Sequence, residues 1–388
     1  MRRSTRLALG AGAVLGLSAW TAPVAAGAEG VHGQPSFREG ADHVVFVQTD
    51  NTAGNHVVAY DRADDGSLVL AHTYNTGGSG GVLNGSAVDH LASQGSLTYD
   101  QRNALLYAVN AGSNTVSVFS VRSDQLTLRQ VLGSGGTFPV SVAVHGNLVY
   151  VLNAENGGSV QGYVVFLDHL FPLPGSNRTL GLVIPSDTTQ FTNTPGQVAF
   201  SPDGSKLIVT TKANGNDIDV FNVGFFGLLS SSPVVNAEPG TVPFAVTFDR
   251  SGQLVVANAG TNALATFILN QDGTVTLVDS VGTGHNSTCW VTPARGFFYA
   301  SNAGSPSVSG YVSGYQVAED GQLTLLGATV TDPGTVDASA SSEGDFLYVQ
   351  TGGNGIVDEF RVGDDGALTG IGSVTVAGAV GGEGIVAF

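Results

Sequence analysis

The chain is poor in the residues that build disulfide frameworks, metal centres and nucleic-acid surfaces. Among 388 residues it has one cysteine, Cys289, with one methionine and two tryptophans. A lone cysteine excludes an intramolecular disulfide and any zinc site built from cysteines. Only 14 residues are Lys or Arg against 31 Asp or Glu, and the basic residues form no cluster in the mature part of the chain. The formal net charge of −17 therefore argues against nucleic acid and anionic lipid as partners.

Long apolar runs are also missing, except at the N-terminus. Three arginines in residues 1–6 precede the apolar stretch LALGAGAVLGLSAW, and the small residues AGA end at residue 28. This pattern predicts a bacterial-type secretory signal peptide over residues 1–28, followed by a short segment, 29–40. The apolar stretch is too short to span a membrane, and no other run reaches about 18 residues. We therefore expect a secreted protein, extracellular or at the cell surface, with no membrane partner after cleavage.

Glycine is abundant, with 55 residues spread along the chain without a triplet period. The missing period excludes collagen. High glycine together with Val, Thr, Ser and Asn is typical of an all-β protein with many turns.

An internal repeat is the strongest pattern in the sequence. A short β-type run ends in Asn or Thr seven times, at Thr49, Asn110, Asn153, Thr211, Asn258, Asn302 and Thr351. Each run is followed by an Asn/Gly loop, an alternating strand, an Asp-Gly turn and a further strand. A spacing of about 50 residues is typical of propeller blades. We therefore predict a seven-bladed β-propeller over residues 41–388, with four antiparallel strands in each blade.

The ends of the repeat predict how the ring closes. The first copy begins directly at its second strand, and the chain ends in an orphan segment, GEGIVAF, at residues 382–388. This segment has the pattern of the innermost strand of other copies, such as GQVAF. The C-terminal strand is therefore expected to complete the first blade, which leaves no free sheet edge.

Two copies carry insertions, at residues 75–95 and 166–193. Long loops on a rigid scaffold often carry function, and they can equally be tolerated insertions.

The loops that follow the second strands are rich in Asn, Gly and Ser and carry few charges, which suits a small polar ligand or a glycan. Aligning the innermost strands on their turns places one residue of each copy in a ring near the channel mouth. The ring consists of Ser96, Ser141, Gln197, Ala245, Cys289, Asp337 and Ile385. The candidate ligand-binding residues are Gln94, Ser96, Ser141, Gln197, Cys289 and Asp337. The position after the ring, Trp290 in the sixth copy, is expected to be core between blades.

Several segments resemble one family of propellers. They include DHLASQGSLTYDQRNALLYAVNAGSNTVSVFSV, TPGQVAFSPDGSKLIVTTKANGNDIDVF and STCWVTPARGFFYASNAGS. They are similar to seven-bladed lactonase-type propellers, which include 6-phosphogluconolactonase-like proteins and 3-carboxymuconate lactonizing enzymes. The resemblance implies a hydrolase or cyclase that acts on a lactone, or on a related small carboxylated ring, at the channel mouth.

This chain lacks the sequence motif that the lactonizing members of that family share. Its lactonizing members resemble one another in a Gly-Pro-Arg-His run, whereas Gln197 occupies the most similar place in this chain. Lactone chemistry needs a general acid or base and a donor for the developing charge. The candidates are Asp337 as base, Lys212 as cation, and His285. Each candidate also has a structural alternative. Asp337 can be a hydrogen-bonded channel residue, and Lys212 a solvated loop residue. His285 can be a surface residue, and Cys289 an inert thiol.

The missing motif leaves a second function open, a non-catalytic extracellular propeller that recognises glycan or protein. The sequence contains no HExxH motif, Walker loop or G-x-S-x-G elbow. We therefore expect neither a cofactor nor a metal, and we expect a monomer.

Overall fold

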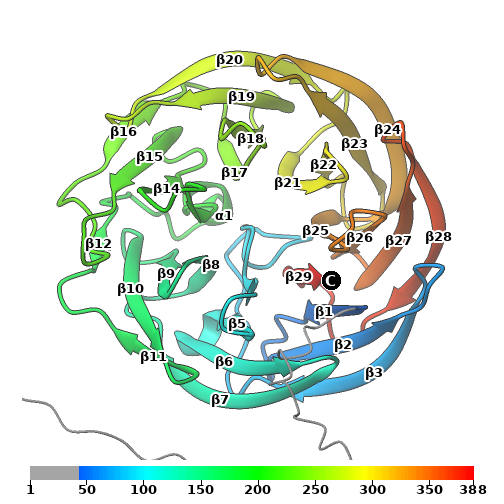
Figure 1. Cartoon of the computed structure of the whole chain (residues 1–388), viewed down its shortest axis with the longest axis horizontal. Coiled ribbons are helices and arrows are strands. Elements are labelled where there is room, and N and C mark those ends of the chain that lie inside the picture. The colour runs from blue at the N-terminus through cyan, green and yellow to red at the C-terminus, as the bar shows by residue number, and fades with distance from the viewer. Residues whose placement is uncertain (1–42) are drawn as a thin grey trace, which may run out of the picture. The chain divides into compact units, whose positions relative to one another are not determined.

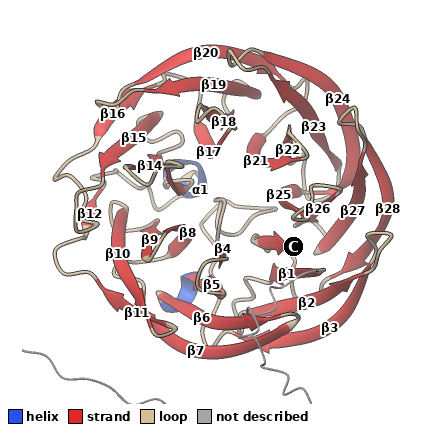
Figure 2. Cartoon of the chain, viewed as in Figure 1, coloured by secondary structure: helices blue, strands red, loops and turns tan. Residues whose placement is uncertain are grey.

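The computed structural model describes residues 43–388, so the predicted signal peptide and the segment 29–40 lie outside the described residues. The described chain forms seven antiparallel sheets arranged around a central channel (Figure 1). Helical structure within the described residues is confined to two short turns (Figure 2), η1 (Ala111–Ser113) and α1 (Gln190–Asn193). The predicted seven-bladed β-propeller is therefore confirmed. No helix within residues 43–388 is long and apolar enough to cross a membrane.

Each blade runs from an innermost strand at the channel to an outermost strand at the rim. Blade 1 contains, in this order, β29 (Ile385–Ala387), β1 (Val44–Gln48), β2 (His56–Arg62) and β3 (Leu68–Asn75). Blade 2 contains β4 (Leu97–Asp100), β5 (Leu105–Asn110), β6 (Thr115–Arg122) and β7 (Gln125–Gly133). Blade 3 contains β8 (Pro139–His145), β9 (Leu148–Asn153), β10 (Ser159–Phe166) and β11 (His169–Pro172), and β12 (Arg178–Thr179) also pairs with β10.

The remaining four blades follow the same order. Blade 4 contains β13 (Val198–Phe200), β14 (Lys206–Thr210), β15 (Asp217–Asn222) and β16 (Val234–Ala237). Blade 5 contains β17 (Pro243–Phe248), β18 (Leu254–Asn258), β19 (Ala263–Leu269) and β20 (Val275–Gly282). Blade 6 contains β21 (Thr288–Ala294), β22 (Phe297–Asn302), β23 (Ser309–Val317) and β24 (Leu323–Pro333). Blade 7 contains β25 (Thr335–Ala340), β26 (Phe346–Thr351), β27 (Ile356–Val362) and β28 (Leu368–Thr375).

Burial explains why the strands differ in sequence. The second strand of each blade is covered by neighbouring blades on both faces, so it is an almost continuous apolar run, as in LLYAVN of β5, where all six residues are buried. The outermost strands are largely exposed and mix apolar with polar residues, as in LVLAHTYN of β3. The core therefore lies between blades, and the channel is lined by innermost strands.

The C-terminal strand closes the ring as predicted. In the register of β29 on β1, Val47 pairs with Ile385 and Val45 pairs with Ala387. The first blade is thus built from both ends of the described chain. Every innermost strand then has a partner on its outer side, so closure depends on pairing across more than 300 residues of sequence.

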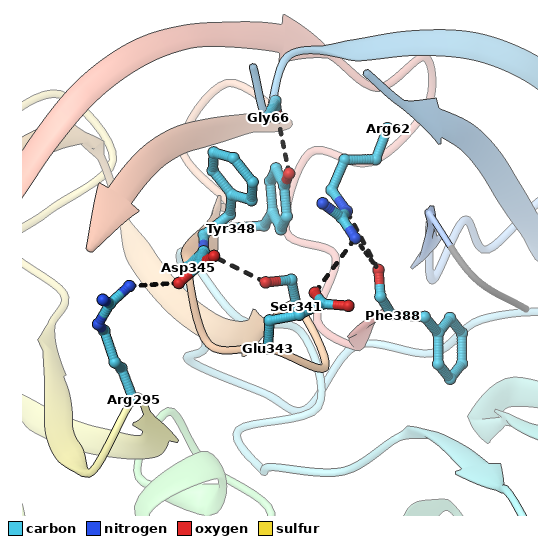
Figure 3. Close-up of polar contacts among 9 residues, drawn as sticks. Arg62, Gly66, Arg295, Ser341, Glu343, Asp345, Tyr348 and Phe388 are labelled. Atoms are coloured by element: carbon cyan, nitrogen blue, oxygen red, sulfur yellow. Dashed lines mark hydrogen bonds and ion pairs between the residues drawn. The ribbon is translucent and has the colours of Figure 1, made fainter. Parts of the chain in front are cut away.

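A cluster of polar contacts holds this junction (Figure 3). Arg62 Nη2 donates to the backbone oxygen of Phe388 at 2.9 Å and to the Glu343 carboxylate of blade 7 at 3.4 Å. The Tyr348 hydroxyl of blade 7 donates to the backbone oxygen of Gly66 in blade 1 at 2.7 Å. These contacts lie at the turns joining first to second and third to fourth strands, which we call the turn face. We call the opposite side, with the loops joining second to third strands, the loop face.

Candidate functional site

The first insertion fills the channel mouth. Residues 76–96, which we call the plug, connect β3 to β4 and run across the centre of the ring (Figure 1). Leu83, Leu91, Ala92 and Ser93 in the plug are 0–3% exposed. The channel mouth, where a ligand site was predicted, is therefore occupied largely by part of the chain itself.

The plug is bound to the blades around it. Trp290 Nε1 of blade 6 donates to Ser93 O at 2.6 Å, and the Ser93 hydroxyl donates to Val140 O of blade 3 at 2.9 Å. Gln94 exchanges two hydrogen bonds with the Val291 backbone, both 3.0 Å long. These partners belong to blades 3 and 6, on different sides of the ring, and they fix the plug across the channel.

Glu383 holds the plug on the side of blade 1. Its carboxylate accepts the Gly95 N–H at 2.9 Å and the Ser93 hydroxyl at 3.3 Å. The Ser96 hydroxyl donates to the Glu383 backbone oxygen at 2.8 Å. Glu383, two residues before the closing strand, therefore connects the ring closure to the plug.

Lys212 is buried and connects the two insertions. Its ammonium donates to Ala92 O of the plug and to Phe191 O of the second insertion, both at 2.6 Å, and to the Thr194 hydroxyl at 3.0 Å. These three acceptors satisfy all three donors of a lysine. Burial lowers the pKa of Lys212 to about 7, against the opposing attraction of the Asp89 charge. The alternative of a solvated loop lysine is therefore wrong, because Lys212 is 1% exposed.

The second insertion covers the plug from the loop face. The Asn84 N–H donates to Gln190 Oε1 at 2.7 Å, and Asn84 Nδ2 donates to Ser186 O at 3.0 Å. The Phe191 N–H donates back to Asn84 O at 3.3 Å. The two insertions that were predicted as candidate functional loops thus meet above the channel.

Four buried carboxyl groups lie in or beside the plug, namely Asp89 of the plug itself and Asp50, Asp337 and Glu383 around it. Desolvation by burial raises the pKa of Asp50 and of Asp337 to about 7, and that of Asp89 to about 6. Burial, together with the neighbouring carboxylates, raises the pKa of Glu383 well above its usual value. Asp337 and Glu383 hydrogen-bond through their carboxyl groups, which requires a proton between them. This cluster therefore holds protons near neutral pH.

A pocket remains between the plug and blades 5 and 6 on the loop face. This mouth pocket has a volume of about 290 Å³. Phe191, Phe244, Trp290 and Pro306 form apolar parts of its wall. The rings of Phe244 and Trp290 pack at 5.1 Å between centroids. Among the described residues Asp89 is the one ionisable carboxyl on the wall, and Cys289 also lines the pocket.

The structure divides the predicted ligand-binding residues between several places. Gln94, Gln197 and Asp337 line a second cavity of about 400 Å³, whose wall also includes residues of the turn face. Ser96 and Ser141 are fully buried, and the Ser141 hydroxyl donates to Gln94 O at 2.7 Å. Cys289 alone of this set lines the mouth pocket.

Strand pairing shifts the predicted ring by one residue in blade 6. In blade 6 Trp290 pairs with Ser301, and in blade 3 the equivalent pair is Ser141 with Leu152. Trp290, and not Cys289, therefore occupies the ring position of Ser141. Cys289 is the bulged residue before it, equivalent to Phe244 in blade 5. Blade 1 shows a shift in the opposite direction, because Gln48 bonds to Gly384 and the predicted Ile385 lies one position later.

The shift in blade 6 follows from the turn on which the strands were aligned, because two residues join β21 to β22 whereas five residues join β17 to β18. The bulge at the start of the strand is common to blades 3, 5 and 6. A bulge adds one unpaired residue, and a shift of one residue turns each side chain to the other face. Trp290 is buried against blade 5 as expected, and its indole N–H also reaches the plug. Cys289 is partly exposed and lines the mouth pocket. Burial raises the pKa of its thiol to about 12, which is the behaviour of an inert thiol.

The three candidate catalytic residues do not form one site. Asp337 lines the second cavity, and its Oδ1 accepts the Ala338 N–H at 2.9 Å. His285 stacks on Tyr311, with 3.9 Å between ring centroids. Lys212 makes three hydrogen bonds beneath the plug.

Asp89 was missed by the sequence-based reasoning. Its carboxylate accepts the N–H groups of Leu91, Ala92 and Ser93 at 2.8, 2.8 and 2.9 Å. One signal pointed to it, because Asp89 is the only acidic residue in the insertion 75–95. The repeat register could not place it, since the insertion has no counterpart in other blades.

No group of three or more His, Cys, Asp or Glu side chains within residues 43–388 is arranged to hold a metal ion. The structure thus adds no candidate metal site to the pocket.

Comparison with known proteins supports the fold. No family model matches the chain, and no curated protein matches it. A 6-phosphogluconolactonase-like protein from Bacteroides fragilis superposes with a TM-score of 0.71 at 18% identity, covering 91% of this chain and 99% of its own. The periplasmic gluconolactonase of Pseudomonas aeruginosa gives a TM-score of 0.68 at 16% identity, covering 88% and 98%. Virginiamycin B lyase from Staphylococcus aureus gives 0.52 at 10% identity, covering 77% and 90%. The predicted resemblance is therefore confirmed at the level of fold.

Proposed function

We propose that the protein is a secreted lactone hydrolase whose reaction takes place in the mouth pocket. The observation that carries this proposal is the combination of an enclosed apolar wall with one carboxyl group, Asp89, whose pKa is raised to about 6 by burial. A general base works best when its pKa lies near the working pH. The shared fold with a gluconolactonase supports the same class of chemistry.

In this reaction Asp89 activates water. The ionised carboxylate takes a proton from a water molecule as the water oxygen attacks the lactone carbonyl carbon. The tetrahedral intermediate then breaks its ring C–O bond, and Asp89 returns the proton to the leaving alkoxide, which yields the open hydroxy acid. A carboxylate offers about four acceptor sites, and the plug's N–H groups occupy three, so one is left for water.

Two serines are placed to assist. Ser287 and Ser305 line the mouth pocket, and neither hydroxyl has a hydrogen-bond partner within residues 43–388. Hydroxyl donors of this kind stabilise the oxyanion that forms on the carbonyl oxygen. Cys289 is not the nucleophile, because its thiol stays protonated at neutral pH.

The test is hydrolysis of a panel of lactones by the purified protein. Asp89→Asn keeps an oxygen for the plug's N–H groups and removes the base, so we expect kcat to fall by about 10²–10⁴. We expect kcat/KM of the native protein to rise with pH through about 6, following ionisation of Asp89. Asp219→Asn is the matched control, because Asp219 is a buried acid in β15, with a pKa raised to about 7, outside the pocket.

Two results would contradict this assignment. Turnover that survives in Asp89→Asn but is lost in Asp337→Asn would move the reaction to the second cavity. No turnover across the panel would remove the enzyme proposal altogether.

A second candidate is a non-catalytic binding propeller. It is favoured by the absence of any Lys, Arg or His side chain among the described residues that line the mouth pocket. Saturable binding of a lactone or a glycan without any turnover would select this function.

A further inference from the structure

We infer that the mouth pocket accepts an uncharged lactone with an apolar ring or alkyl substituent, and that it rejects phosphorylated and carboxylated lactones. This inference rests on the proposed function, because it names the substrate class of the same site. Three observations carry it: the apolar side chains of the pocket wall, the hydrogen-bond donors already bound to protein acceptors, and the nearby cation Lys212, whose donors are all occupied.

The wall offers apolar surface on several sides. Phe191 of the second insertion, Phe244 of blade 5 and Trp290 of blade 6 contribute aromatic rings, and Pro306 lies on the loop-face side. The volume of about 290 Å³ is at the lower end of the range for ligand pockets. A compact ligand is therefore enclosed mainly by rings and aliphatic groups, which stabilise it in proportion to the apolar area removed from water.

Several of the donors that a polyhydroxylated sugar ring could use are already bound to protein acceptors. The indole N–H of Trp290 donates to Ser93 O at 2.6 Å, so Trp290 presents only its ring to the pocket. The plug's N–H groups from Leu91 to Ser93 donate to Asp89. A sugar lactone would lose hydrogen bonds to water on every side, whereas the hydroxyl groups of Ser287 and Ser305 lie on one part of the wall and the aromatic rings replace none of these bonds.

Within residues 43–388, no cation of the pocket is available to pair with an anionic substituent. Lys212 has all three donors bound to protein acceptors, and its Nζ lies 5.2 Å from the Phe244 ring centroid. Asp89 adds negative charge to the wall once it ionises. A phosphate would enter this pocket unpaired and beside a carboxylate, which is costly in a low-dielectric site.

The experiment compares three probes with the purified protein, namely dihydrocoumarin, glucono-δ-lactone and 6-phosphoglucono-δ-lactone. We expect kcat/KM for dihydrocoumarin to exceed that for the phosphorylated lactone by at least about 100-fold, equivalent to about 2.7 kcal/mol. Equal or greater turnover of the phosphorylated lactone would overturn the inference while leaving the proposed function intact. Turnover of none of the three would instead contradict both proposals.

A pair of variants tests the charge argument directly. Val88 lines the pocket and is partly exposed, so Val88→Arg adds a cation there, while Val88→Leu changes only shape. We expect Val88→Arg to shift relative kcat/KM toward the phosphorylated lactone by at least about 10-fold, and Val88→Leu to leave the order of substrates unchanged. The same shift in Val88→Leu, or none in Val88→Arg, would refute charge as the cause.

Binding gives a readout that does not depend on turnover. Trp20 lies in the predicted signal peptide, so the secreted protein carries Trp290 as its only indole. A neutral aryl lactone that packs against Trp290 should change its fluorescence, and the phosphorylated lactone at equal concentration should not. The reverse order of response would contradict the inference.

Discussion

Asp50 gives the sharpest test of the buried carboxyl cluster. Its side chain is fully buried beside the plug, where it accepts the Glu383 N–H at 2.8 Å and a hydrogen bond from Gln48. Burial raises the pKa of Asp50 from 3.8 to about 7, and the charge of Asp89 adds to the rise. The folded protein therefore binds a proton more tightly than the unfolded chain does. This stabilisation is fully present below about pH 3.8 and is lost as the pH rises through about 7.

The magnitude follows from the two pKa values. A difference of about three units corresponds to about 4 kcal/mol once Asp50 is ionised in both states. Most of this loss falls between pH 5 and pH 8, where Asp50 alone contributes about 2–3 kcal/mol. We therefore expect the native protein to lose at least this much unfolding free energy over that range.

Asp50→Asn removes the titration while keeping the shape. The backbone of Asp50 has φ of 50°, a left-handed conformation that asparagine tolerates well. Gln48 Oε1 is buried without a partner and can accept a hydrogen bond from the new amide. Any constant cost of the substitution cancels when unfolding free energy at pH 5 is compared with that at pH 8.

The assay is urea unfolding at the two pH values. We expect the loss between pH 5 and pH 8 to be smaller by about 2–3 kcal/mol in Asp50→Asn than in the native protein. Asp64→Asn, in an exposed turn of blade 1, is the control and should show the native loss. The same pH dependence in Asp50→Asn and the native protein would refute the reasoning.

Three further predictions concern closure, the plug and the thiol. Deleting residues 382–388 should abolish cooperative melting by circular dichroism, because β1 loses its partner, and native-like melting would contradict this. Lys212→Met leaves the buried Ala92 carbonyl unpaired and removes one of the two donors to Phe191 O, so it should cost about 1–3 kcal/mol and raise hydrogen exchange in residues 76–96, while unchanged exchange there would argue against the anchor. Cys289 should react with iodoacetamide at pH 8 about 10³ times more slowly than a free thiol, because desolvation raises its pKa to about 12, and rapid labelling would contradict the inert thiol.

Local sequence rules accounted for the blades and failed at the register of one innermost strand. Apolar runs such as β5 follow from patterns a few residues long. Cys289 and Trp290 were assigned to the wrong register positions, because the strands were aligned on turns whose lengths differ, two residues in blade 6 and five in blade 5. The alternation of residues along the strand does not show how many residues the turn takes up, and only the strand pairing fixes that number.

Asp89 shows a different limit. Its role depends on the plug crossing the channel, and the plug has neither period nor counterpart in the other copies. The contacts that place it come from Lys212, Trp290 and Glu383, which lie more than 100 residues away in sequence.

The sequence alone determined the seven blades, the ring closed by residues 382–388 and the two insertions as loops. These features depend on alternation, turn residues and a repeat, which act over short distances and recur seven times. Only the tertiary structure decided that the plug fills the channel mouth, that Lys212 is buried, and that Asp89 and Trp290 line one pocket. These outcomes depend on single contacts between distant segments, and no local pattern encodes them.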